Sequence, residues 1–177
     1  MDVPAILAAI REQYVLTWDG LHGISHWARV YENGLLLAES VEVNRDLILL
    51  FALFHDACRV NDSVDPGHGK RGAELAASMR GEFFQLPQDD FDLLYEACAK
   101  HTRGLVRAAP VVQVCWDADR LDLLRASIVP NPAKLCTPVA KDPKVIKWAM
   151  ERSRLAVFPE AVRSVWGLER TKHSRVT

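Results

Sequence analysis

The apolar residues of the chain recur mostly three and four positions apart, which is the spacing of one face of an α-helix. This pattern predicts a helix over Val3 to about Leu16 and a second from Ile24 to about Ala38. A third run, Arg45 to about Cys58, follows Asn44, whose side chain can cap a helix. The interior of this third run is apolar on every side, so we expect it to form the buried centre of the fold.

The second half of the chain continues the helical spacing. We predict a helix from about His68 to Phe83, another that Pro87 opens, a third from about Pro110 to Leu121 and a last one from about Asp142 to Val157. Three prolines should make the segment Val129–Pro138 irregular. The chemistry of the chain is therefore carried on helices and on the loops between them.

Turn-forming residues fill the segment Arg59–Gly67, which we expect to be a loop. No run alternates between apolar and polar residues in the manner of a half-buried strand. The predicted fold is therefore all-α, a compact helical bundle of about six to eight helices in one domain over residues 1–177. The tail after Gly167 is polar and basic, and we expect it to fray.

Composition excludes several classes of protein. The 177 residues are 49% hydrophobic and 25% charged, as in an ordinary globular domain rather than a disordered chain. Twenty-two basic residues face 23 acidic ones, so the formal charge of −1 gives no support to a long nucleic acid as partner. The longest mostly apolar run, Leu47 to Phe54, is too short to span a membrane.

The N-terminal sequence and the cysteines both suggest a cytoplasmic protein. The chain starts Met-Asp-Val-Pro, without a basic region before an apolar stretch, so it does not resemble a secretory signal. No two cysteines form a CxxC pair, and each lies among apolar residues. We expect them to be reduced thiols, packed as small hydrophobic side chains. They are Cys58, Cys98, Cys115 and Cys136.

The adjacent residues His55 and Asp56 close the central apolar helix. Burying a carboxylate is costly unless a cation or a metal ion neutralises it. Histidine and aspartate are ordinary ligands of divalent ions, so the pair is a candidate metal site. The alternative is an ion pair between Asp56 and nearby Arg59, with His55 as a satisfied core residue.

Other histidines occupy positions from which they can reach the same site. His26 lies at the start of the second predicted helix, His68 on the inner face of the fourth, and His101 on the inner stripe of the fifth. His22 stands four residues before His26, a spacing that ligands can use, but flanking glycines place it in a loop. We therefore leave His22 outside the predicted ligand set.

A second group of acidic residues lies in an apolar helix. At about 100° per residue, Asp117 and Asp119 point nearly opposite ways, so only one of them can face a given site. Asp119 shares its side of the helix with Asp122. We expect at least one of Asp117 and Asp122 to pair with Arg120 or Arg125 on a solvated face.

These residues together carry a family resemblance. The order His26-x-x-Arg-Val, then His55-Asp56, then Ala-Asp119-Arg-Leu resembles the HD-domain superfamily of metal-dependent phosphohydrolases over about residues 22–128. The fold of that family is all-helical. The resemblance implies that His26, His55, Asp56 and Asp119 ligate one divalent ion, which can be Mn, Mg, Fe, Co, Ni or Zn.

The resemblance also bears on a second ion. In the two-metal members, the aspartate of the His-Asp pair bridges to an ion that histidines of the next two helices hold. His68 and His101 stand in those regions here. Members with a firm second site often carry two adjacent histidines, whereas this chain has His101-Thr102. Without a second ion, His68 and His101 would donate hydrogen bonds to a phosphate.

Two departures narrow the expected substrate. The guanosine tetraphosphate hydrolases of the superfamily carry a Glu-Asp pair where this chain has Arg59 and Val60, and the Gly-Tyr-Pro signature of the cyclic-di-nucleotide branch is missing. We expect a nucleotide or another small phosphate ester as substrate and partner. The alternatives are a metal-dependent module that binds or senses a nucleotide without turnover, and a purely structural helical domain.

Further residues are candidates for catalysis. Asp56, His68 and His101 head this set because of their place in the motif. The cationic candidates for contact with the phosphate, in or beside the loop after the His-Asp pair, are Arg59, Lys70 and Arg71. The alternative for Lys70 and Arg71 is a solvated first turn of the helix. Asp62 and Asp65 can act as a general base or orient a ligand, or can simply form the turn. Oligomeric state is left open.

Overall fold

The computed structural model describes residues 1–168, so most of the predicted tail lies outside the described residues. These residues form eight α-helices and three short 3-10 helices, without a β-strand, and the all-α prediction is confirmed. The helices are α1 (Val3–Gln13), α2 (Ile24–Leu37), α3 (Arg45–Phe54), α4 (His68–Met79), α5 (Gln88–Lys100), α6 (Pro110–Leu121), α7 (Pro143–Arg154) and α8 (Glu160–Val165). The 3-10 helices are η1 (His101–Arg103), η2 (Leu123–Ala126) and η3 (Pro132–Lys134).

Local signals account for most helix ends. Asn44 caps α3 as predicted, because its side chain accepts a hydrogen bond from the backbone N–H of Asp46 at 3.0 Å. Helix α1 ends earlier than predicted, since Tyr14 is already extended. The sequence pattern missed α8, whose six residues are too few to show a helical period. None of the helices formed by residues 1–168 is long and apolar enough to cross a membrane.

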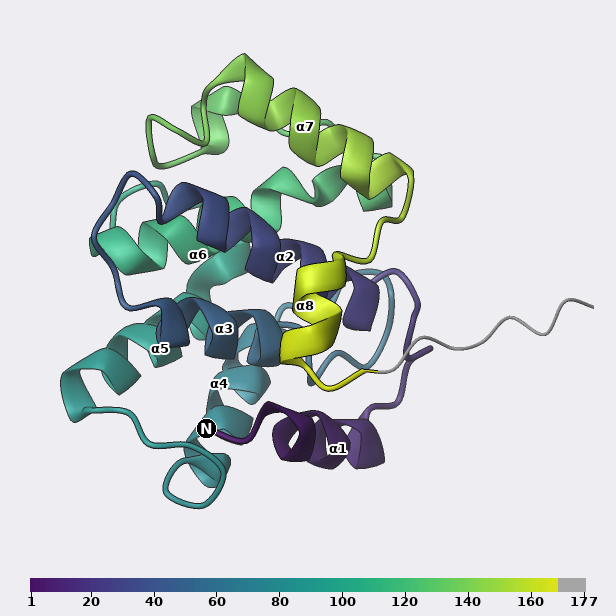
Figure 1. Ribbon diagram of the computed structural model, residues 1–177, viewed down its shortest axis with the longest axis vertical. Coiled ribbons are helices and arrows are strands. Elements are labelled where there is room, and N and C mark those ends of the chain that lie inside the picture. Colours follow the sequence, from purple (N-terminus) through teal and green to yellow (C-terminus); the bar gives the residue numbers. More distant parts are fainter. Residues whose placement is uncertain (169–177) are drawn as a thin grey trace, which may run out of the picture.

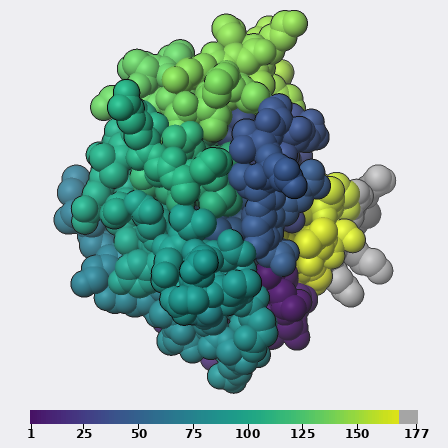
Figure 2. All heavy atoms as spheres, turned by 90° about the vertical axis from the view of Figure 1, so that its left-hand side faces the viewer, coloured from purple at the N-terminus to yellow at the C-terminus, as the bar shows by residue number. Residues whose placement is uncertain are grey.

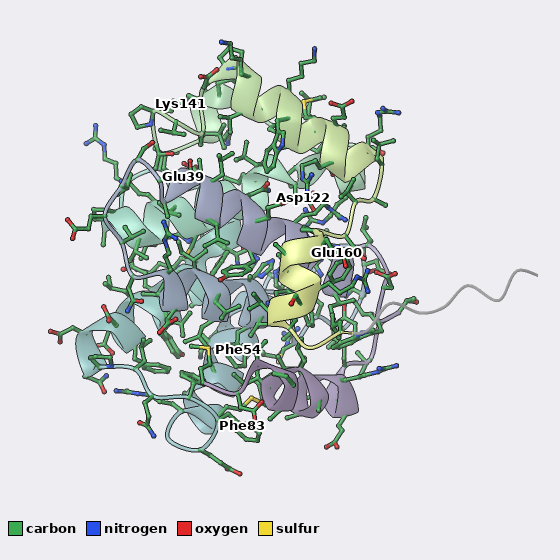
Figure 3. All side chains as sticks on the ribbon, viewed as in Figure 1. Glu39, Phe54, Phe83, Asp122, Lys141 and Glu160 are labelled. Atoms are coloured by element: carbon green, nitrogen blue, oxygen red, sulfur yellow. The ribbon has the colours of Figure 1, made fainter. Side chains whose placement is uncertain are left out.

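Helix α3 is the centre of the bundle, as its apolar sequence predicts. Every residue from Leu47 to Phe54 is buried, and α2, α4, α5 and α6 all contact this helix. Figure 1 shows it between α2 and α6 above and α4 and α5 below. In Figure 3, Phe54 and Asp122 lie inside the bundle, whereas Glu39 and Lys141 lie at its outside.

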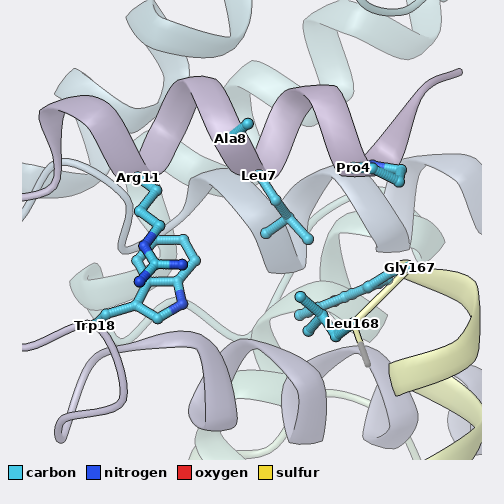
Figure 4. A pocket seen from close by; sticks show the side chains of 8 residues that line it. Pro4, Leu7, Ala8, Arg11, Trp18, Gly167 and Leu168 are labelled. Atoms are coloured by element: carbon cyan, nitrogen blue, oxygen red, sulfur yellow. The ribbon is translucent and has the colours of Figure 1, made fainter. Parts of the chain in front are cut away.

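The last helix, α8, packs on the outside of the bundle. Helix α8 packs on α2, and Figure 2 shows the two segments side by side although they lie far apart in sequence. The ring of Trp166 stacks on Tyr31, with 6.3 Å between the ring centroids. A shallow cavity of about 220 Å³ lies between α1 and the end of α8, where Leu7, Arg11 and Trp18 are among its lining residues (Figure 4).

Two glycines let α4 approach its neighbours backbone to backbone. A β-carbon at Gly72 would clash with the carbonyl oxygen of Phe54, at the end of α3. One at Gly69 would clash with the carbonyl oxygen of Cys98 in α5. The start of α4 is therefore held against the ends of α3 and α5, where the predicted site residues stand.

We predict that Gly72→Ala lowers the free energy of unfolding by about 1–3 kcal/mol, the usual range for overpacking. Alanine is the better helix former by about 1 kcal/mol, so a gain in stability is the outcome if the backbone contact is unimportant. Urea unfolding followed by circular dichroism measures the difference. Glu74→Ala, on the exposed face of the same helix, is the control and should change stability by less than about 0.5 kcal/mol.

Candidate metal centre

Three helices bring the four predicted ligands together. His26 lies in the first turn of α2, His55 and Asp56 follow the end of α3, and Asp119 lies in the last turn of α6. The Nε2 atom of His26 is 3.7 Å from Asp56 Oδ2 and 3.5 Å from Asp119 Oδ1. The Nε2 atom of His55 is 3.9 Å from each of the same two oxygens. Two imidazole nitrogens and two carboxylate oxygens therefore face one point.

We call His26, His55, Asp56 and Asp119 the first group. Asp56 also belongs to a second group, which it forms with His68 and His101. The Oδ1 atom of Asp56 lies 3.0 Å from His68 Nε2 and 3.6 Å from His101 Nε2. These two nitrogens are 2.9 Å apart. Although it is buried, Asp56 Oδ1 has no hydrogen-bond partner with acceptable geometry. Asp56 thus offers one oxygen to each group, and the second group contains the two histidines that the sequence analysis assigned to it.

The outer ring nitrogen of each histidine fixes its tautomer. In all four rings, Nδ1 lies against an oxygen, and for three of them this oxygen is a backbone carbonyl that can only accept a hydrogen bond. The Nδ1 partners are Asp122 Oδ2 for His26 (2.8 Å), the Phe51 carbonyl for His55 (3.1 Å), the Asp65 carbonyl for His68 and the Cys98 carbonyl for His101 (2.8 Å). Each neutral ring therefore carries its hydrogen on Nδ1 and points the lone pair of Nε2 inward.

This arrangement favours a cation between the first two rings. The Nε2 atoms of His26 and His55 are only 3.0 Å apart, and two lone pairs at this distance repel each other. A shared proton does not remove the repulsion at neutral pH, because burial lowers the pKa of His26 and lowers that of His55 to about 3. The donor set of two imidazoles and two carboxylates fits a divalent ion.

The second pair of rings differs in one respect. Burial lowers the pKa of His101, but hydrogen bonding to Asp56 and the charge of Asp119 outweigh it, and the net shift is upward. A proton between His101 and His68 is therefore less unfavourable than a proton between His26 and His55. Both groups could hold a metal ion, and a proton competes with the ion more readily in the second group than in the first.

The buried carboxylates are ionised. Burial opposes the charge of Asp56, but the adjacent His55 and three further imidazoles outweigh it and hold the pKa of this carboxyl well below its usual range. Burial likewise opposes the charge of Asp122, and its hydrogen bonds with His26 and Arg29 lower its pKa to about 2. The site therefore offers full negative charges to a cation at neutral pH.

The expected solvated face for Asp117 and Asp122 does not exist. Both carboxylates are buried, at 0% and 1% exposed. Helix α6 packs on α2 on one side, and residues 134–137 cover the other. Arg125 does lie near Asp122, with 4.0 Å between Nη1 and Oδ2, but this contact is buried as well. The donors of Arg120 go to the carbonyl of Lys134 and to the thiol of Cys136.

The two carboxylates have separate structural tasks. Asp117 accepts hydrogen bonds from the backbone N–H groups of Cys136 and Thr137, both at 2.7 Å, and so anchors the irregular segment after η3. Asp122 accepts two hydrogen bonds from Arg29, at 2.7 and 3.1 Å, as well as the one from His26. Asp122 therefore orients a ligand of the first group, a role that the sequence analysis did not assign to it.

A cavity of about 250 Å³ leads from the surface to the two groups, and we call it the mouth. His22 lines it, with Nδ1 2.8 Å from Asp56 Oδ2. The loop that carries His22 is held in place, because the carbonyl oxygen of His22 accepts hydrogen bonds from Tyr14 Oη at 3.0 Å and Trp27 Nε1 at 2.8 Å. The flanking glycines correctly indicated a loop, but they gave no sign of this contact with Asp56.

The structure brings only some of the predicted cationic residues to the mouth. Arg59 lines it, with Nη1 3.5 Å from Asp56 Oδ1. Lys70 does not reach it, because its side chain is 68% exposed and pairs with Glu74 at 3.6 Å. Asp62 lines the mouth. Asp65 does not line it: its carboxylate accepts from the backbone N–H of Val60, at 3.0 Å, and from the side chain of Arg71.

Sequence reasoning missed one cationic residue at the mouth. The Nη2 atom of Arg125 lies 3.6 Å from Asp119 Oδ1 and 3.9 Å from Asp56 Oδ2. Burial opposes the charge of Asp119, but the Arg125 guanidinium outweighs it and lowers the pKa of that carboxyl. Arg125 lies in η2, beyond the helix stripe that located Asp119, and no local signal distinguishes it from a surface arginine.

Comparison with known proteins agrees with the site. The family model of the HD domain matches residues 23–124, more than half of the chain, and this protein therefore belongs to the HD domain family. It is similar to the crystal structure of a predicted HD superfamily hydrolase from an uncultured Thermotogales bacterium. The identity is 26%, the match covers 92% of each chain, and the TM-score is 0.62. A comparison with curated proteins finds no match.

Family membership confirms the resemblance carried by the three motifs and supports a metal-dependent hydrolase family for this chain. All four cysteines are free thiols in the structure, as expected: Cys98 and Cys115 are buried, and Cys58 and Cys136 are partly exposed.

We predict that Asp122→Asn weakens binding of the first ion by about 10- to 100-fold, the usual effect of losing a partner that orients a ligand. The variant keeps the shape of the side chain but not the charge that holds His26 Nδ1. Titration of the metal-free protein with Mn²⁺ measures the affinity. Asp117→Asn, a buried carboxylate of the same helix without a histidine contact, is the control. Equal Mn²⁺ affinity in the two variants would contradict this role.

Proposed function

We propose that this protein is a metal-dependent phosphohydrolase that cleaves a nucleotide or another small phosphate ester. The observation that carries the proposal is the pair of inward Nε2 atoms of His26 and His55, 3.0 Å apart and each facing the carboxylates of Asp56 and Asp119. Two buried lone pairs this close to each other repel, and a bound cation would remove the repulsion. Membership of the HD domain family supports the hydrolase class.

A divalent ion held by these residues would supply an activated water and would neutralise charge on the phosphoryl oxygens. Donor chemistry admits Mn, Mg, Fe, Co, Ni or Zn, because the set mixes imidazole nitrogen with carboxylate oxygen. His26, His55, Asp56 and Asp119 would hold the first ion. His68, His101 and the second oxygen of Asp56 would hold a second one, if it is present.

The residues around the ligands have roles that follow from their contacts. His22 donates its Nδ1 hydrogen to Asp56 Oδ2 and keeps that oxygen aimed at the first group. Arg59 places a positive charge beside Asp56 Oδ1, and its Nη2 is held by the carbonyl of Ser63 at 2.8 Å. Asp62 is the carboxylate at the mouth that can accept a proton from water or substrate. In the absence of a second ion, His68 and His101 would donate hydrogen bonds to the phosphate only as imidazolium ions, because their Nδ1 hydrogens are bound to backbone carbonyls.

The mouth favours a compact substrate. Its volume of about 250 Å³ is small, and its described lining includes neither Phe, Tyr nor Trp on which a nucleobase would stack. Leu21, Leu123 and Ile128 form an apolar wall instead. These features favour a small phosphate ester over a nucleotide. A metal-dependent sensing module would keep the same ligands and show no turnover, so an assay of phosphate release separates it from the enzyme.

We predict that Asp56→Asn loses the metal and the activity together. The change removes a charge from the one residue that belongs to both groups. Losing a residue that only orients a ligand costs up to about 100-fold in activity, so the loss of Asp56 should lower the rate of phosphate release by more than this. Metal content is measured by mass spectrometry on protein purified without an affinity tag, and turnover with Mn²⁺ and a panel of phosphate esters. Asp46→Asn, exposed at the other end of the same helix, should match the wild type. Unchanged turnover in Asp56→Asn would rule out the assignment.

We predict that metal removal destabilises the protein. At an Mn²⁺ concentration 100 times the Kd, binding should stabilise the fold by about 2.7 kcal/mol. This corresponds to a rise in Tm of about 5–10 °C for a chain of this size. Thermal unfolding of chelator-treated protein, with and without added Mn²⁺, measures the shift. The Asp56→Asn variant should show none, and a wild-type protein that shows none either would favour the structural reading.

A further inference from the structure

We propose that Arg125 binds the phosphate group of the substrate; this inference rests on the proposed function. Arg125 lies in η2, immediately after the helix that carries Asp119. Its side chain is only 8% exposed, yet it lines the mouth together with Asp56 and Asp119. A buried guanidinium that faces a cavity is an uncommon arrangement, because a charge is left out of water only where it has a partner or a ligand.

Two backbone oxygens fix the orientation of the guanidinium. The Nε atom donates to the carbonyl of Leu21, and Nη1 donates to the carbonyl of Asp122, both at 3.1 Å. Carbonyl oxygens orient the group without cancelling its charge. Nη2, by contrast, makes no hydrogen bond with any residue of the described chain, since its nearest acidic oxygens lie at 3.6 and 3.9 Å. Nη2 thus makes only these two longer ion pairs, and its donors remain available to a ligand.

The other two arginines near the site are already committed. Arg29 donates Nε and Nη2 to the carboxylate of Asp122. Arg59 donates Nε to the carbonyl of Asn61 and Nη2 to that of Ser63, and its Nη1 lies against the ring of His68. Arg125 is the arginine whose terminal donor stays available beside the oxygens of the first group.

The charge of the site also calls for an anion. Three ionised carboxylates and three guanidinium groups are joined by ion pairs of 4.0 Å or less, so their formal charges cancel. They are Asp56, Asp119 and Asp122 with Arg29, Arg59 and Arg125. Asp62 also lines the mouth and adds one negative charge, so a divalent ion gives the site an excess of one positive charge, which attracts an anion such as phosphate.

A phosphate that enters the mouth meets Nη2 of Arg125 beside the two carboxylates of the first group. A guanidinium suits this task, because its hydrogen bonds to phosphate are charge-assisted and planar. Arg125 would bind the ground-state phosphate and would also stabilise the negative charge that its oxygens carry during cleavage. Losing it should therefore raise KM and lower kcat.

The test is the affinity of the Mn²⁺-loaded protein for inorganic phosphate, measured by calorimetry. Arg125→Met should bind phosphate about 10- to 100-fold more weakly, the usual effect of losing a hydrogen bond to a charged group. Arg125→Lys keeps a positive charge near the carboxylates and so protects the fold. It should still bind phosphate about 10-fold more weakly, because a single ammonium group cannot donate to the carbonyls of Leu21 and Asp122 and also reach the phosphate. Arg154→Met, exposed at the end of α7, is the control and should match the wild type.

Metal content and folding are checked in every variant before affinities are compared. If Arg125→Met loses its metal or its fold, Arg125→Lys decides the question. A metal-loaded variant of Arg125 with wild-type affinity for phosphate would overturn the inference.

Hydrolysis of phenyl phosphate is measured separately, so that the two proposals fail in different ways. Phosphate binding that depends on Arg125 without any turnover would support Arg125 and reject the hydrolase. Turnover with the same KM and kcat in wild type and Arg125→Lys would support the hydrolase and reject Arg125.

Discussion

A single buried carboxylate, that of Asp56, governs the rest of the structure. It is 1% exposed and directly follows the end of the most apolar helix, α3. The carboxyl end of a helix carries a partial negative charge, so this position is doubly unfavourable for an anion. Five imidazoles and two guanidinium groups gather around it, and they come from helices and loops of both halves of the chain.

Close packing of the backbone brings further residues to Asp56. Because Gly69 and Gly72 carry no side chain, α4 can lie directly against the ends of α3 and α5. This approach brings His68 to Asp56 and to His101, which lies just after α5. Backbone carbonyl oxygens then hold the outer nitrogens of three rings, so the fold itself sets the tautomers that present lone pairs to a cation. Stability and metal binding are linked through these contacts.

The site consists of three successive shells of residues. Imidazoles and carboxylates form the inner shell and suit a divalent ion. Arginines form the next shell and neutralise the carboxylates in part, as Arg29 does for Asp122. The mouth completes the arrangement, since it is lined by Arg125 and by the apolar side chains of Leu21, Leu123 and Ile128. Such an arrangement suits a small anionic ester better than a long polyanion, in agreement with the near-zero net charge of the chain.

Helix periodicity by itself indicated the all-α fold and the central place of α3, and three short motifs carried the family resemblance that pointed to His26, His55, Asp56 and Asp119. These features depend on residues near one another in sequence, or on one helix face, which periodicity reports directly. Only the tertiary structure decided the roles of His22, Asp117, Asp122 and Arg125 and the position of Lys70 outside the site. Their partners lie in loops and helices far away in sequence, and whether such a side chain meets solvent or a carboxylate depends on which segment folds over it.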